Sequence, residues 1–533
     1  MKTLWYGGSI YTLMEEGHQV EAVLTEDDRI MAIGTMKEIE EKYRDEISEK
    51  INLNGSTMLP GFVDSHLHLI GHGEKLIRLD LSAYRSKPEL LMAIKEYAEN
   101  LNEGEWLIGE GWNENLWDEP NPIVRMEIDE VVPNHPVLLK RICRHTLVVN
   151  SLALKEAAVS EEKEYSSEGV IGKDKNGQLN GLFKEEAQAL ILKAVPKATD
   201  EYLKRALRAA IQDAYKQGLT GGHTEDLSYY NGLQSTFKIF EEIIKEEGCR
   251  FRAHLLVHHK VMDEFQKMGG YFLKGDKWIE FGAIKIFTDG SLGGRTALLS
   301  HPYADDPTTN GVAIFSQEQL NSLVKRAREM DMPIAVHAIG DLAFDMTLQA
   351  IEANPLNGSG RDRLIHAQIL RKELIDRAKK LPIVLDIQPA FVASDFPWVM
   401  ERIGEDNMDY CYAWKTLLEE KLPCAGGSDA PIEAIHPLLG IHAAVTRTNP
   451  RDEQQVAYKP EECLSIYEAV CLFTKGSAFA ACHERENGMI KEGFLADFTI
   501  LDRDIFLCKS EELLMTEVEK TVVGGEIMYS STK

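Results

Sequence analysis

The sequence predicts an α/β protein built on a (β/α)8 TIM barrel, and three observations support this fold class. The middle of the chain alternates helical segments with short apolar runs, which is typical of parallel strands buried on both faces. Both ends of the chain read instead as short strands joined by tight turns. The length of 533 residues accommodates an elaborated barrel. Periodicity alone does not separate a closed barrel from an open sheet, but the number of such units favours the barrel.

The two ends of the chain are expected to form one small β-sandwich domain from residues 1–58 and 482–533. The expected strands span residues 4–12, 19–24, 30–33, 497–501 and, around a Gly-Gly turn, 521–528. The barrel then occupies residues 59–481.

Within the barrel, helix starts and strand-like runs follow one another in order. Ser86 to Glu89 and Ser316 to Gln319 fit the capping box, and a helix over residues 199–217 should end at Gly218. The strand-like runs after it span residues 281–287, 333–337, 363–366, 382–385 and 422–426. The stretch at about 73–181 is too long for one crossover, so we expect an insertion after the first barrel strand that could cover the barrel mouth.

Composition excludes several classes of function. The chain has 59 basic and 86 acidic residues, a formal net charge of −27, and 44% hydrophobic residues. Enough apolar side chains are present to build a core, so the chain is not a disordered acidic segment. An acidic surface repels phosphate backbones and anionic membranes, so neither nucleic acid nor a membrane is an expected partner.

Cysteine spacing and the N-terminus indicate a cytoplasmic protein. The eight cysteines include no CxxC pair, which argues against a disulfide framework and a zinc ribbon. The first residues lack the apolar core of a signal peptide, and no apolar run reaches the ~18 residues of a membrane span.

The strongest local signal for chemistry is a His-x-His pair. His66 and His68 follow Pro60-Gly61 at the end of an apolar run. Side chains two residues apart in a strand point the same way, so these two imidazoles can form half of a first-row metal site. A pair of histidines that only form hydrogen bonds is the alternative.

Three later residues stand where other barrel strands should end. His337 and His366 close apolar runs, and Asp429 follows Gly-Gly-Ser after the last one. The C-terminal ends of barrel strands converge on one mouth, so these side chains should meet His66 and His68 there. Asp429 could bind a metal and also accept a proton from its water. Each residue alone has a structural alternative, a buried histidine or a turn aspartate.

Lys285 lies inside the apolar run 281–287, where a charged ammonium is costly. As a neutral amine it could add carbon dioxide to become a carbamate, an anion able to bridge two cations. The alternative is an ion pair with Asp289 or another carboxylate.

Together these motifs resemble the amidohydrolase superfamily of metal-dependent hydrolases. The ordered set is the His-x-His pair, the strand lysine, two separate histidines and a final Gly-Ser-Asp. Neighbouring strings around Trp112, Lys285, His337 and His366 resemble the subgroup that includes N-substituted formamide deformylase.

The resemblance implies a set of metal ligands, made up of His66, His68, Lys285 as carbamate, His337, His366 and Asp429. It implies one or two divalent ions, with zinc as the default, and a possible homodimer. Substrate contacts are implied for Trp112, His145, Glu185 and Asp289, although packing explains the first two equally well and a helix start explains Glu185.

The expected reaction is hydrolysis of a carbon–nitrogen bond in a small-molecule amide or formamide, not a peptide bond. A metal-bound hydroxide would attack the carbonyl, and Asp429 would carry the proton to the leaving nitrogen. Two alternatives remain: a mononuclear, deaminase-like site with Lys285 unmodified, and a non-catalytic scaffold on the same fold.

Overall fold

The structure is a computed structural model. It describes all residues except 103, 115–116, 118, 120, 142–145, 162, 164–169, 359 and 532–533. The side chains of residues 185 and 186 are also outside the description. The chain forms two compact units, residues 1–72 with 207–533 and residues 73–206. In the part of the chain that is described, no helix is both long and apolar enough to cross a membrane. The cysteines described there are free thiols.

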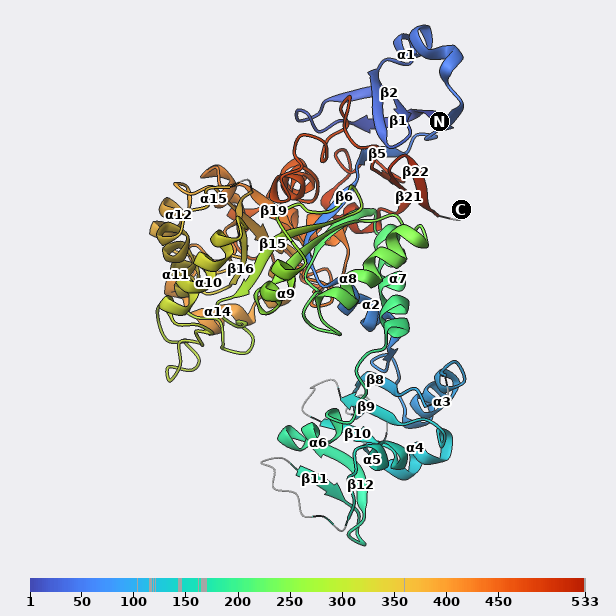
Figure 1. The fold of residues 1–533 in the computed structure, drawn as a ribbon, viewed down its shortest axis with the longest axis vertical. Helices are drawn as coiled ribbons and strands as arrows, with labels where there is room; N and C mark the ends of the chain where they lie inside the picture. The colour runs from blue at the N-terminus through green and yellow to red at the C-terminus, as the bar shows by residue number, and fades with distance from the viewer. Residues whose placement is uncertain are drawn as a thin grey trace. The chain divides into compact units, whose positions relative to one another are not determined.

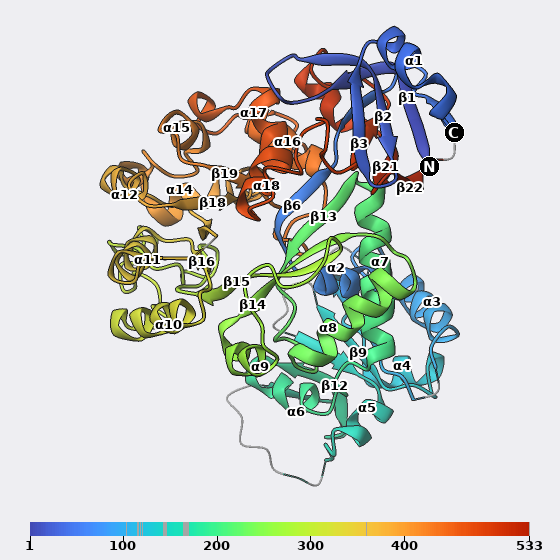
Figure 2. The same ribbon diagram turned by 45° about the horizontal axis from the view of Figure 1, so that its top comes forward.

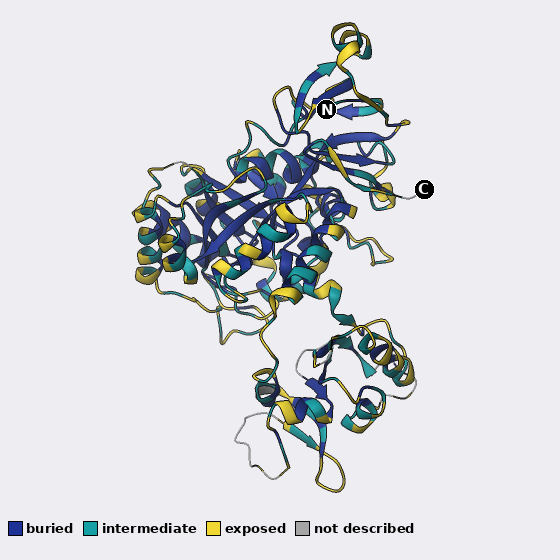
Figure 3. Cartoon of the chain, turned by 45° about the vertical axis from the view of Figure 1, so that its right-hand side comes forward, coloured by how far each residue is buried: buried dark blue, intermediate teal, exposed yellow. Residues whose placement is uncertain are grey.

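The larger unit contains a parallel barrel sheet of eight strands, which confirms the expected fold class. Its strands, in chain and sheet order, are β6 (Phe62–Leu67), β13 (Leu219–Thr224), β14 (Arg252–His258), β15 (Ile279–Phe287), β16 (Ile334–Ala338), β17 (Asp362–His366), β18 (Ile383–Ile387) and β19 (Cys424–Gly426). The strands are buried, as the dark blue ribbons of Figure 3 show. Every strand pair is parallel, so the C-terminal ends lie at one mouth.

Helices flank the outside of this sheet, as Figures 1 and 2 show for α10, α11 and α12. The helices of the larger unit are α1 (Met36–Tyr43), α8 (Leu233–Glu241), α9 (Met262–Lys267), α10 (Gln317–Glu329), α11 (Asp341–Ala353), α12 (Lys372–Ala378), α13 (Ala390–Asp395), α14 (Trp398–Ile403), α15 (Trp414–Glu419), α16 (Pro437–Thr446), α17 (Ile466–Cys471) and α18 (Ser477–Ala480). Two further helices, α2 (Leu69–Ile77) and α7 (Asp200–Lys216), contain the points in the chain at which one unit ends and the other begins. The predicted capping box at Ser316 and Gln319 is present. Gly218, with φ of 82°, follows the end of α7 as expected for a left-handed cap.

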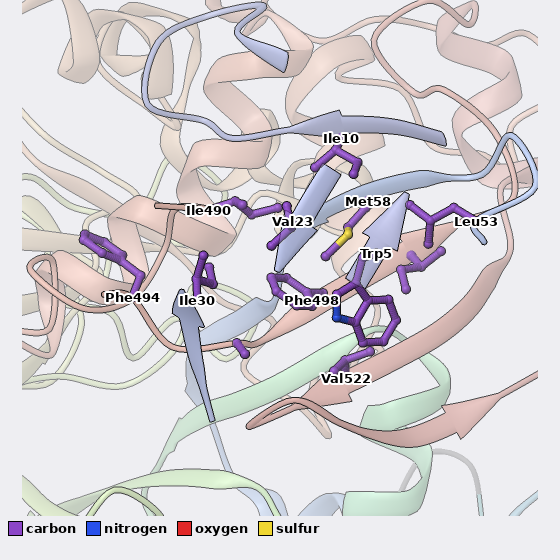
Figure 4. Packing of buried hydrophobic residues seen from close by; sticks show 12 residues of the cluster. Trp5, Ile10, Val23, Ile30, Leu53, Met58, Ile490, Phe494, Phe498 and Val522 are labelled. Carbon is purple, nitrogen blue, oxygen red and sulfur yellow. The ribbon is translucent and has the colours of Figure 1, made fainter. Parts of the chain in front are cut away.

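The two termini build a second sheet in the same unit. Its strands are β1 (Lys2–Tyr11), β2 (Gln19–Glu26), β3 (Arg29–Gly34), β4 (Glu49–Asn52), β5 (Thr57–Pro60), β20 (Phe498–Leu501), β21 (Val518–Val523) and β22 (Glu526–Ser530). β5 pairs with both β1 and β20 and so joins the two ends of the chain. Trp5, Ile10, Phe498 and Val522 belong to one buried cluster beneath the sheet (Figure 4). The Trp5 and Phe498 rings meet edge to face at 5.7 Å.

The smaller unit carries its own mixed sheet and helices. Its elements are β7 (Leu79–Asp80), α3 (Lys87–Ala98), β8 (Leu107–Trp112), α4 (Arg125–Val131), β9 (Val137–Arg141), β10 (Thr146–Val149), α5 (Ser151–Glu156), β11 (Val170–Lys173), β12 (Leu179–Lys184) and α6 (Ala189–Leu192). Trp106, Trp112 and Trp117 are buried in the two hydrophobic clusters of this unit.

Candidate metal centre

Three of the expected ligands meet at the barrel mouth. His66 is the buried penultimate residue of β6, His68 follows the strand, and Asp429 lies in the segment after β19. Asp429 Oδ1 is 3.4 Å from His66 Nε2 and 3.5 Å from His68 Nε2. The three ligand atoms lie within 4.8 Å of one another. They come from the first and last barrel strands and the residues that follow them. A hydrogen bond of 2.8 Å from Asp429 N to His66 O holds these two segments together.

The charges of this trio favour a cation. Burial would raise the pKa of Asp429, but the hydrogen bond and charge of His68 outweigh it and keep that pKa below its ordinary value. Burial lowers the pKa of His68, and the contact with Asp429 then raises it to about 9. The buried carboxylate therefore needs a positive charge beside it. A divalent cation held by two imidazoles and this oxygen meets that need.

Lys285 projects from near the C-terminal end of β15 into the same site. Its side chain is fully buried, and its Nζ lies 3.2 Å from His66 Nε2. Burial lowers the pKa of Lys285 to about 8. No carboxylate of the described residues lies within ion-pair distance of this amine, although Glu225, Asp429 and Asp386 attract it from further away. The expected alternative, an ion pair with Asp289, is not formed.

His337 and His366 stand beside the trio, at the ends of β16 and β17. Their ring centroids are 4.4 Å apart, and the His366 ring lies 5.7 Å from that of His66. Burial lowers the pKa of His366 to about 4 and that of His337 well below its ordinary value. Both imidazoles are therefore neutral at neutral pH, which is the form that binds metals.

Carbonyl oxygens orient three of the four imidazoles. His68 Nδ1 donates to Glu225 O at 2.9 Å, and His337 Nε2 donates to Gly290 O at 3.0 Å. His366 Nδ1 donates to the side-chain oxygen of Gln388 at 2.7 Å. Because each carbonyl accepts a proton from one ring nitrogen, the other nitrogen is the one that offers a lone pair when the ring is neutral. This arrangement is typical of histidines that bind metals.

The backbone is strained at two of these residues. His366 has φ of 80°, Ala367 has φ of 46° and Asp429 has φ of 57°, all in the left-handed region that non-glycine residues rarely adopt. Strain of this kind costs about 1–3 kcal/mol per residue and concentrates at functional sites. Here it turns the histidine and the aspartate into the barrel mouth.

Sequence reasoning missed the residues that hold these ligands. Asp64, two positions before His66, accepts hydrogen bonds from the backbone N of His66 at 3.0 Å and of Ser428 at 3.1 Å, which ties the first strand to the last. Alternation along β6 could have identified it, because Asp64 and His66 share a face. Glu225 is fully buried, accepts a hydrogen bond from Tyr229 at 2.5 Å, and has its Oε1 without a partner among the described residues. The sequence feature that could have identified Glu225 is the acidic pair Glu225-Asp226 at the end of an apolar run.

The four residues expected to contact substrate are Asp289, Trp112, His145 and Glu185. Both Asp289 oxygens are engaged: Oδ2 accepts from Leu298 N and Gly340 N, each at 2.9 Å, and Oδ1 accepts from Ile339 N at 3.1 Å. Asp289 therefore orders loops at the mouth. Trp112 is buried within the smaller unit, and its indole N donates to Leu139 O. His145 and the Glu185 side chain lie outside the described residues. Substrate contact by these four stays a prediction.

Comparison with known proteins identifies the family of this chain. The chain is 51% identical over 532 residues to the putative amidohydrolase YtcJ of Bacillus subtilis, covering 100% of each. It is 26% identical over 535 residues to N-substituted formamide deformylase of Arthrobacter pascens, covering 96% of this chain and 95% of that protein. A solved structure of an uncharacterized metal-dependent hydrolase from Pyrococcus furiosus matches with a TM-score of 0.81 and 28% identity, over 95% of this chain and 100% of that one. The profile described as "Amidohydrolase family" matches residues 49–529. This chain therefore belongs to the amidohydrolase family of metal-dependent hydrolases.

Proposed function

We propose that this protein hydrolyses a carbon–nitrogen bond in a small amide or formamide. The observation that carries the proposal is the buried trio of His66, His68 and Asp429 at the mouth of the barrel. Its donor atoms suit zinc, and the relative that acts on N-substituted formamides, by its name, supports the substrate class. The buried tryptophans of the smaller unit give no support for an aromatic substrate.

The chain's own residues supply positions and proton transfer. When bound, a divalent cation supplies a Lewis acid that polarises a carbonyl and lowers the pKa of a water. His66, His68 and Asp429 would hold it, with His337, His366 and Lys285 beside them for a second ion. Asp429 accepts the proton of the attacking water and returns it to the leaving nitrogen as the carbon–nitrogen bond breaks. Glu225 O and Gln388 keep His68 and His366 oriented throughout.

We further propose that Lys285 carries a carbamate. Burial lowers its pKa to about 8, so a substantial fraction is the neutral amine that reacts with carbon dioxide. The product is an anion in a pocket of imidazoles. An unmodified lysine with a single ion held by His66, His68, His337 and Asp429 is the second candidate, because the compact trio already supplies three of the four donors of a zinc site.

Metal analysis joined to a substrate screen tests the proposal. The purified protein is stripped with a chelator, reloaded with zinc, and assayed against N-formyl, N-acyl and cyclic amides. We expect activity on at least one class, loss of that activity on stripping, and recovery with zinc. Activity that survives complete metal removal would contradict the proposal. One ion at the catalytic centre, with no effect of bicarbonate, would select the one-ion candidate.

A further inference from the structure

A second cluster of metal-binding side chains lies at the other end of the barrel strands. His254 is near the start of β14 and Glu280 near the start of β15, and the two residues are register partners. Lys285 lies five residues further along β15, which is about 16 Å at the usual rise per residue. His483 joins them from the segment after α18. The cluster is therefore distinct from the centre at the C-terminal ends.

The three side chains converge on one oxygen. Glu280 Oε1 lies 2.7 Å from His254 Nδ1 and 2.6 Å from His483 Nε2. All three atoms lie within 4.8 Å of one another. Hydrogen bonds from both histidines outweigh the effect of burial and lower the pKa of Glu280 to about 2, so the carboxylate is ionised. Two imidazoles and a carboxylate are a common donor set for zinc and other first-row divalent ions.

The neighbouring residues hold the two rings in place. His483 Nδ1 is 3.0 Å from Glu486 Oε1, a carboxylate of the kind that orients metal-binding histidines. A β-carbon at position 282 would lie 2.3 Å from His254 Nε2, so Gly282 leaves the space that the imidazole occupies. Both rings thus turn one nitrogen toward Glu280.

A cavity gives a cation access and room for further ligands. Its volume is about 300 Å³, and its lining includes His223, His254, Glu280, His483 and Glu486. His223 is 3% exposed, and its Nδ1 has no hydrogen-bond partner among the described residues. Its ring centroid lies 4.8 Å from that of His254. A buried nitrogen without a partner is costly, and a bound water or ion beside it removes the cost.

We propose that His254, Glu280 and His483 form a second divalent-cation site, able to bind zinc, at the N-terminal end of the barrel. Water from the cavity completes the coordination, with His223 facing it. The site has a structural role, because His483 belongs to the segment that leads from α18 to the terminal sheet. A cation would fasten that segment to β14 and β15.

A hydrogen-bonded network without metal is the competing explanation. It, too, loses stability when Glu280 is changed, so stability does not separate the two. Metal content does, because the network binds no ion.

The experiment counts zinc in full-length chains that lack the catalytic trio. The background carries His66→Asn, His68→Asn, His337→Asn, His366→Asn and Asp429→Asn, so that neither ion of the catalytic centre can bind. It is stripped with a chelator and titrated with zinc against a chromophoric chelator. We expect about one tightly bound zinc per chain. Adding Glu280→Gln or His483→Gln should abolish it, or weaken it at least tenfold. His18→Gln, at an exposed histidine, is the matched control and should leave the count unchanged.

Two further readouts keep the test decisive. If the background variant does not fold, native mass spectrometry of the otherwise unaltered chain should show one ion fewer in Glu280→Gln. Cobalt in place of zinc should give visible absorption bands that disappear in His483→Gln. A background chain that binds no zinc, or zinc that persists in Glu280→Gln and His483→Gln, would overturn the proposal, whatever the outcome at the catalytic centre.

Discussion

In the proposed mechanism, Asp429 combines two roles at a single carboxylate. One oxygen faces both histidines of the His-x-His pair, and the strained backbone at φ of 57° aims the side chain into the mouth. A residue in this position can bind a cation and exchange a proton with water bound to it. Geometry, rather than an unusual pKa, makes this possible, because the carboxylate is simply kept ionised.

We expect Asp429→Asn to lower kcat about 10²- to 10⁴-fold at saturating zinc, because an amide cannot accept the water proton. Steady-state kinetics with a measured zinc content checks this result. Asp409→Asn, at an exposed aspartate, is the control and should retain full activity. An Asp429→Asn protein that binds zinc and works at full rate would refute the proton-transfer role.

Lys285 gives a second prediction at this scale. The fully buried amine lies beside His66 and has no carboxylate at ion-pair distance among the described residues. Protein equilibrated with ¹³C-bicarbonate should therefore show a carbamate carbon resonance, and activity should fall when carbon dioxide is removed. Lys285→Arg should lack the resonance, because a guanidinium stays charged and does not add carbon dioxide. A fully active protein that shows no carbamate resonance after equilibration with ¹³C-bicarbonate would favour the one-ion centre.

At the scale of elements, the site depends on the seam between the first and last barrel strands. Ser428 N and His66 N both donate to Asp64, and Asp429 N donates to His66 O. Gly427 lies on this seam, where a β-carbon would be 2.7 Å from His66 N and 2.9 Å from Asp64 Oδ1. Backbone atoms cannot move aside cheaply, so no side chain is tolerated here.

Gly427→Ala should therefore separate His66 from Asp429 and cost about 1–3 kcal/mol of stability. We expect zinc affinity to fall with it, measured by competition with a chelator, while urea denaturation reports the stability. Gly293→Ala, where the nearest atom is 3.7 Å away, is the matched control. Unchanged zinc affinity in Gly427→Ala would show that the seam does not position the ligands.

Sequence patterns predicted elements better than the contacts between them. Strand alternation and strand-end placement predicted that His66, His68, His337, His366 and Asp429 would converge, because parallel strands share one mouth. The supporting residues depend on register between strands distant in sequence. Asp64 meets Ser428 across 364 positions, and no local pattern encodes that pairing. Trp112 lies in a hydrophobic core of the smaller unit, and its contact with substrate stays a prediction.

At the scale of the molecule, the terminal sheet and the barrel share one compact unit, and a buried ion pair joins them. Arg252 begins β14, and Asp497 immediately precedes β20. Arg252 Nε is 2.5 Å from Asp497 Oδ2, Nη2 is 2.9 Å from Oδ1, and the guanidinium lies over Trp278 at 4.8 Å. The side chains are 11% and 1% exposed, so water does not screen the pair.

Removing one partner of this pair should therefore be costly. Asp497→Ala leaves Arg252 buried without its counter-charge and also frees Gly524 N, which donates to Asp497 at 2.7 Å. We expect a loss of about 3–5 kcal/mol in the free energy of unfolding of the larger unit, measured by urea denaturation with circular dichroism. The double variant Arg252→Met with Asp497→Leu should recover part of that loss, because no unpaired charge remains.

Glu41→Ala, which removes an exposed pair with Lys37 at 3.8 Å, should cost less than about 0.5 kcal/mol. If Asp497→Ala cost no more than this surface control, the buried pair would not be what couples the terminal sheet to the barrel.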